Sequence, residues 1–157
     1  MRHHDHLTSA QQNSLLREIG RALVKAAPRN WEELRLECDA LFDFSTTEAT
    51  AVLDDGSTEQ MSTPVEVAVK LGKLRAGMYT PGKGTWYRAV CRVTRPGRFK
   101  AHYSYDEEPS FPIPAYDHDF LRDSRAYPRD SASTPDWLRR RLAAALEAEA
   151  VAKANDK

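Results

Sequence analysis

The sequence predicts an α+β fold: a four-stranded antiparallel sheet with helices packed on one face. The first observation is alternation of apolar and polar residues on both sides of Pro96-Gly97, which is typical of an antiparallel hairpin. The second is another pair of alternating segments before residue 54. The third is that helical periodicity occurs before, between and after these strand pairs, so the helices are set apart from the hairpins. The predicted order is helix, strand, strand, helix, strand, strand, helix, helix.

Length and composition favour a single soluble domain. The chain has 157 residues, about the size of one domain, and its 23 basic side chains balance 23 acidic ones. A balanced charge disfavours a dedicated nucleic-acid binder, and no apolar run is long enough to span a membrane. The start of the chain lacks an apolar segment, so we expect no secretory signal and a cytoplasmic protein. We expect a flexible tail at residues 1–7, one domain over 8–151 and a frayed C-terminus at 152–157.

The first helix is predicted over Ser9–Ala27. Ser9 and Gln12 have the spacing of a capping box, and Pro28 with Asn30 would end the helix. The residues at helical spacing on its apolar face are Leu15, Leu16, Ile19, Ala22, Leu23 and Ala26.

Two strands are predicted next, over Trp31–Cys38 and Thr47–Leu53. In the first strand Leu34, Leu36 and Cys38 share one face, which indicates a half-buried strand. A turn signal, Asp54-Asp55-Gly56, follows the second strand. The segment 41–46 between the strands fits no single element.

A helix is predicted from Thr63-Pro64 to Gly77. Thr63 can cap its first turn, Pro64 suits the first helical position and Gly77 can end it. Its buried face would consist of Ala68, Leu71 and Leu74. The alternation of Val65, Val67 and Val69 also fits a strand, so that alternative stays open.

The hairpin is the clearest prediction. Its first strand is expected over Thr85–Val93, and its second strand begins after Gly97. The residues predicted on one face are Tyr87, Ala89, Cys91 and Val93 in the first strand and Phe99, Ala101, Tyr103 and Tyr105 in the second.

Two helices close the domain after a loop that prolines stiffen. Pro109, Pro112 and Pro114 keep residues 106–115 out of a sheet interior. A short helix is predicted over Tyr116–Ala126. A longer one starts near Ser133-Thr134-Pro135-Asp136, and its apolar stripe is Leu138, Leu142, Ala145, Leu146 and Ala150.

Motifs for catalysis or metal binding are absent from the sequence. Cys38 and Cys91 fall on the apolar phase of predicted strands and are expected to be buried thiols. Consecutive helical residues point in different directions, so Asp117, His118 and Asp119 would not converge on a metal. His102 lies on the polar phase of its strand without a marked partner. We therefore predict no catalytic residue, no metal site, no cofactor and no enzymatic activity.

The charges separate into two regions. Arg88, Arg92, Arg95, Arg98 and Lys100 lie on the hairpin, whereas acidic and aromatic residues gather in the loop and short helix after it. A solvated face is the ordinary interpretation of such a cluster. Aromatic anchors within a polar rim are also what protein interfaces favour. The predicted partner-binding residues are Tyr105, Asp106, Glu107, Glu108, Phe111, Tyr116, Asp117, Asp119 and Asp123.

Several blocks in one order carry a resemblance to a known family. They are Gly84-Thr85-Trp86-Tyr87, Gly97-Arg98-Phe99, Tyr103-Ser104-Tyr105-Asp106, Glu108-Pro109, Tyr127-Pro128-Arg129-Asp130 and Pro135-Asp136-Trp137-Leu138, with an earlier Ala27-Pro28-Arg29-Asn30-Trp31. In these blocks the sequence resembles the YezG-type immunity proteins of bacterial polymorphic toxin systems. The resemblance covers roughly residues 15–142 and is weakest over 41–83.

The resemblance implies a small, cytoplasmic, non-enzymatic protein that binds and neutralises a secreted toxin encoded in the same locus. Such toxins include nucleases and enzymes that degrade NAD. It implies no catalytic residues, no nucleic-acid partner and no membrane partner. Residues 41–83 would then determine partner specificity or be a divergent insertion. The alternative function is a regulatory protein-interaction module with a host partner.

Overall fold

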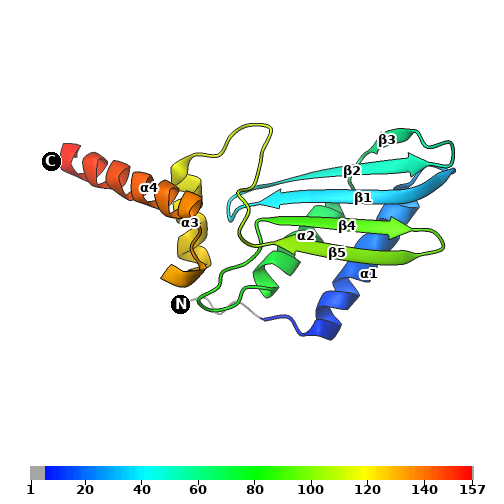
Figure 1. Cartoon of the computed structure of the whole chain (residues 1–157), viewed down its shortest axis with the longest axis horizontal. Helices are drawn as coiled ribbons and strands as arrows, with labels where there is room; N and C mark the ends of the chain where they lie inside the picture. Colours follow the sequence, from blue (N-terminus) through cyan, green and yellow to red (C-terminus); the bar gives the residue numbers. More distant parts are fainter. Residues whose placement is uncertain (1–5, 157) are drawn as a thin grey trace.

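A computed structural model describes residues 6–156 of the chain, which form an α+β domain with a five-stranded antiparallel sheet in the order β3-β2-β1-β4-β5 (Figure 1). The elements are α1 (Ser9–Ala26), β1 (Trp31–Ala40), β2 (Ser45–Leu53), β3 (Thr58–Met61), α2 (Val65–Gly77), β4 (Arg88–Thr94), β5 (Arg98–Ser104), α3 (Asp117–Ala126), a 3₁₀ turn η1 (Ser131–Ser133) and α4 (Asp136–Asn155).

The prediction of four strands is wrong, because β3 adds a fifth at the edge of the sheet. After the predicted turn at Gly56 the chain doubles back and pairs with β2, placing Thr58 opposite Val52 and Met61 opposite Ala49. This strand has only four residues, and its first three are exposed and polar. A strand this short and polar carries no alternation, so sequence periodicity does not reveal it.

The main core lies between one face of the sheet and the helices α1 and α2 (Figure 1). β1 is the central strand, and its Leu34, Leu36 and Cys38 are almost fully buried. The predicted hairpin is confirmed: β4 and β5 pair antiparallel, with Cys91 opposite Ala101. α2 is confirmed as a helix. Its buried face differs slightly from the prediction, because Val67 is buried and Ala68 is only half-buried.

The prediction that all helices pack on one face holds only for α1 and α2. Figure 1 shows α3 and α4 beyond one end of the sheet, with α4 running away from it. There they form a second, smaller core around Leu41, Tyr87, Phe120 and Leu138. Because α4 covers only this small core, Leu146 of its predicted apolar stripe is 51% exposed.

The start of α1 differs from the prediction by one residue. Thr8, not Ser9, caps the helix: its hydroxyl accepts from the Gln11 amide, and the Gln11 side chain accepts from the Thr8 amide. Leu7, at the end of the predicted flexible tail, donates its amide to the Gly77 carbonyl at 2.9 Å and packs against the main core. Residues 1–5 of that tail lie outside the described residues.

Among the helices of residues 6–156, none is both long enough and apolar enough to cross a membrane.

Candidate partner-binding surface

The loop after β5 is held in place by the buried side chain of an arginine that follows α3 in the sequence. The Arg129 side chain is only 4% exposed; its guanidinium donates to the carbonyls of Tyr105 at 2.5 Å and Thr85 at 3.1 Å. It also contacts the Asp106 carboxylate at 3.3 Å. Gly84, at φ +82°, makes room for this arginine, because a Cβ there would lie 2.5 Å from Arg129 Nε.

A second arginine, from α4, ties the loop to α3. Arg141 donates to Glu108 at 2.5 Å and to Asp117 at 2.9 Å, and its guanidinium lies 4.5 Å from the centre of the Phe120 ring. Trp137, also on α4, donates its indole N–H to the Asp106 carbonyl at 2.6 Å. Side chains of α4 therefore hold the first residues of the loop and the start of α3 in place.

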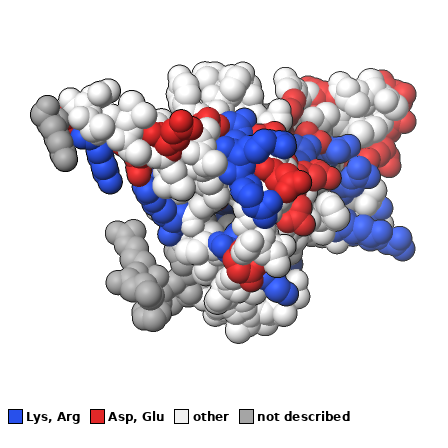
Figure 2. All heavy atoms as spheres, turned by 60° about the vertical axis from the view of Figure 1, so that its left-hand side comes forward, with Lys and Arg blue, Asp and Glu red and all other residues white. Residues whose placement is uncertain are grey.

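The predicted acidic residues do not form one free acidic face. Asp119 accepts from the Tyr116 amide at 2.8 Å and so caps α3. Asp123 is 2% exposed and forms a buried, two-point ion pair with Arg75, at 2.6 and 3.1 Å. Its inclusion among surface residues was wrong, because at helical spacing it falls on the side of α3 that faces the protein. Figure 2 accordingly shows basic and acidic side chains interleaved across the middle of this end of the molecule.

The aromatic residues of the predicted interface also divide between core and surface. Tyr105 is half-buried and packs against the main core, and Phe111 packs edge-on against Phe44 with ring centres 4.9 Å apart. Tyr116 is 78% exposed. Ile113, which sequence reasoning missed, is 83% exposed. Its position between Pro112 and Pro114 could have indicated this exposure, since a residue flanked by prolines does not fit into the interior of a sheet or helix.

We define the loop surface as four exposed residues at this place: Asp106, whose carboxylate also contacts Arg129, and Glu107, Ile113 and Tyr116. Two are apolar and two are acidic. Exposed apolar side chains on a rigidly held loop are suited to anchoring a protein partner, and the acidic ones can select a basic partner.

A shallow hollow of about 550 Å³ lies where the loop meets the open face of the sheet. Asp39 is its most buried acid and accepts from Arg88 at 2.8 Å and from the Ser110 amide at 3.3 Å. Burial raises the pKa of the Asp39 carboxyl above its usual value, against the opposing effects of these two donors. The hollow thus holds an ion pair that joins the sheet to the loop.

The basic residues of the hairpin are partly engaged within the protein. Arg88 pairs with Glu37 as well as Asp39, and Arg95 lies over the Trp31 ring at 4.3 Å. His102 lines a hollow together with Arg35, Arg92 and Lys100. Among the described residues, those that line this hollow include no carboxylate that could exchange a proton with His102.

The two cysteines are buried free thiols, as predicted. Burial raises the pKa of both Cys38 and Cys91 to about 12. At neutral pH both are protonated and therefore poor nucleophiles. Over residues 6–156 no three His, Cys, Asp or Glu side chains gather in a way that could hold a metal ion.

No protein-family model and no curated protein matches this chain.

Proposed function

We propose that this chain is an immunity protein that acts in the cytoplasm. In this role it binds a toxin encoded in the same locus through the loop surface and blocks it without turnover. The sequence resemblance to YezG-type proteins motivates the proposal.

One observation carries it further: the resembling blocks converge on the structure that holds the loop. Gly84 makes room for Arg129, Arg129 binds the Tyr105 carbonyl, and Trp137 binds the Asp106 carbonyl. These residues belong to four different blocks, far apart in the sequence. The residues that carry the resemblance thus form the framework of a loop, which is what a family of binders with different partners would keep in common.

The rigidity of the loop supports tight binding. A loop that is already ordered loses little conformational freedom when a partner binds, so more of the contact energy appears as affinity. Here Arg129 holds the start of the loop, Arg141 binds Asp117 just beyond its end, and three prolines restrict the chain between them. Ile113 and Tyr116 supply the apolar contacts.

The direct test is co-expression with the polypeptide encoded next to this chain. We expect a stoichiometric complex that survives purification, and rescue of growth when the toxin is induced. A purified toxin activity assay should show inhibition that is complete at a one-to-one ratio. At less than one equivalent the inhibition should not grow with time, as it would if this chain inactivated the toxin enzymatically. A neighbouring toxin that neither binds this chain nor is neutralised by it would contradict the proposal.

A further inference from the structure

The strand β5 ends the sheet, so among the described residues its outer edge has no strand beside it. The backbone N–H and C=O groups along such an edge can pair with a further strand. Natural sheets often end in a strand too short for this, as β3 does with four residues at the other edge. β5 has seven residues, contains no proline and pairs with β4 in an unbroken register. It is therefore long and regular enough to accept a sixth strand.

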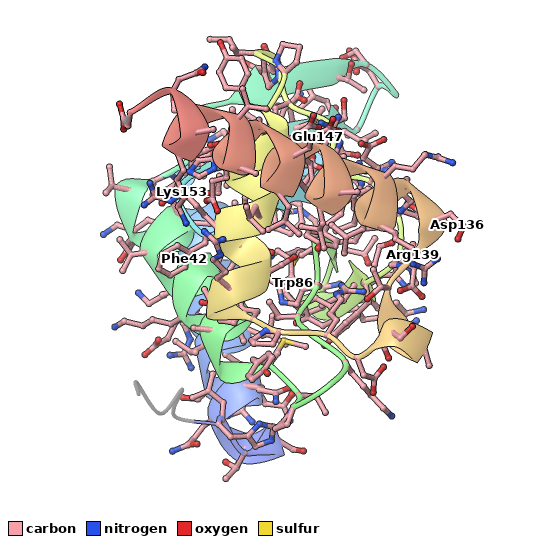
Figure 3. All side chains as sticks on the ribbon, turned by 90° about the vertical axis from the view of Figure 1, so that its left-hand side faces the viewer. Phe42, Trp86, Asp136, Arg139, Glu147 and Lys153 are labelled. Atoms are coloured by element: carbon pink, nitrogen blue, oxygen red, sulfur yellow. The ribbon has the colours of Figure 1, made fainter. Side chains whose placement is uncertain are left out.

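Helix α1 forms a groove with this edge on one face of the sheet. Figure 1 shows the N-terminal half of α1 extending past β5, and Figure 3, which looks along the strands, shows α1 and α2 together on one side of the sheet. A hollow of about 430 Å³ lies between helix and strand, lined by Gln12, Asn13, Leu16 and Arg17 of α1 and by Phe99, Ala101 and Tyr103 of β5. Leu16, Phe99 and Ala101 are only half-buried. Side chains that pointed from an added strand into this groove would therefore meet apolar surface.

The other face of the sheet is basic beside the same edge. Lys100 of β5 lies directly opposite Arg92 of β4, and Arg92 lies directly opposite Arg35 of β1. Together with His102, these three cations line the second hollow, of about 500 Å³. Arg35 pairs with Glu37 at 2.9 Å, whereas Arg92 and Lys100 form no ion pair within residues 6–156. Like charges directly opposite one another destabilise a sheet, so this row of cations favours an anionic group bound next to it.

We propose that the edge of β5 binds an extended segment of a partner protein in which acidic and apolar residues alternate. Successive side chains of a strand point to opposite faces. In an added strand one set would lie beside Lys100, where acidic residues fit, and the other set would lie in the groove over Leu16 and Phe99, where apolar residues fit. Strand addition of this kind is a recurrent mode of peptide recognition, in which the backbone supplies affinity and alternate side chains supply specificity.

Charge and shape distinguish this occupant from two others. A second copy that paired through its own β5 would bring Arg98 and Lys100 of both copies together on one face, which is unfavourable. A nucleic acid would gain from the row of cations but would use neither the backbone edge nor the apolar groove. Whether the segment belongs to the toxin rests on the proposed function, but the preference of the edge for such a segment does not.

The preference can be measured on the protein alone with labelled peptides of seven residues, the length of β5. By fluorescence anisotropy Glu-Val-Glu-Val-Glu-Val-Glu should bind at least about tenfold more tightly than Glu-Glu-Glu-Glu-Val-Val-Val or the alternating peptide with lysine in place of glutamate. It should also slow hydrogen exchange of the β5 amides that point away from β4, because these become paired. Unchanged exchange of these amides, equal binding of the block peptide, or tighter binding of a thymidine oligonucleotide would overturn the inference.

A charge reversal at the edge gives a matched pair of variants. Lys100→Glu changes an exposed side chain of β5 and should weaken binding of the alternating peptide about fivefold. The control Lys73→Glu makes the same change at an exposed position of α2 and should leave binding unchanged. Equal binding by the two variants, both folded, would contradict the role of Lys100 and overturn the inference.

The peptide and toxin experiments fail independently. If the toxin forms its complex but the alternating peptide does not bind, the inference fails and the proposed function stands. If the peptide binds as described but no neighbouring toxin does, the proposed function fails and the docking edge stands.

Discussion

Individual arginines decide how this small domain presents its surface. The side chains of Arg75, Arg129 and Arg141 each bind a carboxylate or carbonyl that is distant in the sequence. The acidic partners can be found in the sequence but these pairings cannot, since the order of charges along the chain does not say which side chains meet. These arginines neutralise much of the acidic region. The exposed Ile113 was not among the predicted partner-binding residues.

The buried pair of Arg75 and Asp123 should be essential to stability. In Asp123→Asn the Arg75 guanidinium, which is 4% exposed, would remain charged without its counter-ion. We expect the free energy of unfolding to fall by about 3–5 kcal/mol, measured by urea denaturation. The control Glu107→Gln, at an exposed position, should change it by less than about 0.5 kcal/mol. A loss below about 1 kcal/mol for Asp123→Asn would show that the pair is not needed.

Buried thiols and phenols should make the fold sensitive to alkaline pH. Burial raises the pKa of Cys91 from 9.0 to about 12, and that of Tyr87 and Tyr103 from 10.0 to about 12. Between these values the unfolded chain loses protons that the native state keeps, so ionisation favours unfolding. Stability is therefore complete below about pH 9 and falls as the pH rises toward 12.

Urea midpoints measured from about pH 8 to about pH 11 test this, with Cys91→Ala as the comparison. The variant is less stable at neutral pH because it loses packing, but its stability should decline less steeply above about pH 9. Equal slopes for the two proteins would contradict a buried, protonated thiol at this position.

At the scale of elements, most of the prediction was confirmed where periodicity was long. The hairpin, α1 and α4 follow from apolar spacing and turn residues, and the loop 106–115 follows from its prolines. The short helix predicted over Tyr116–Ala126 is α3. β3 did not, because a four-residue polar edge strand gains its stability from backbone pairing with β2. The placement of α3 and α4 at the end of the sheet depends on Leu41 and Tyr87 reaching across to them, which no local pattern encodes.

The N-terminus of α1 gives a test at this scale. Thr8 closes the capping box with Gln11, so Thr8→Ala should lower the free energy of unfolding by about 1 kcal/mol in urea denaturation. Ser9→Ala removes the residue that the sequence favoured as the cap, and it should be neutral or slightly stabilising because alanine is the better helix former. The reverse ranking would place the cap at Ser9 and contradict the structure.

At the scale of the whole molecule, the fold has two parts with different tasks. The sheet with α1 and α2 supplies the main core, and α3 with α4 supplies a second, smaller core that holds the loop. In Figure 1 the loop lies at the junction of the two. The segment that contains the candidate site could be predicted from the sequence. The framework that holds the loop could not, because it depends on contacts between residues more than twenty positions apart.

The central claim is that the loop surface binds the toxin, and the dissociation constant of the complex tests it most directly. Ile113→Asp combined with Tyr116→Asp should raise the Kd by at least about a hundredfold, because each removes an apolar contact and buries a charge. Val65→Asp, at an equally exposed apolar residue on α2, should leave the Kd unchanged. A Kd unaffected by the double substitution, in a protein that remains folded, would contradict the account.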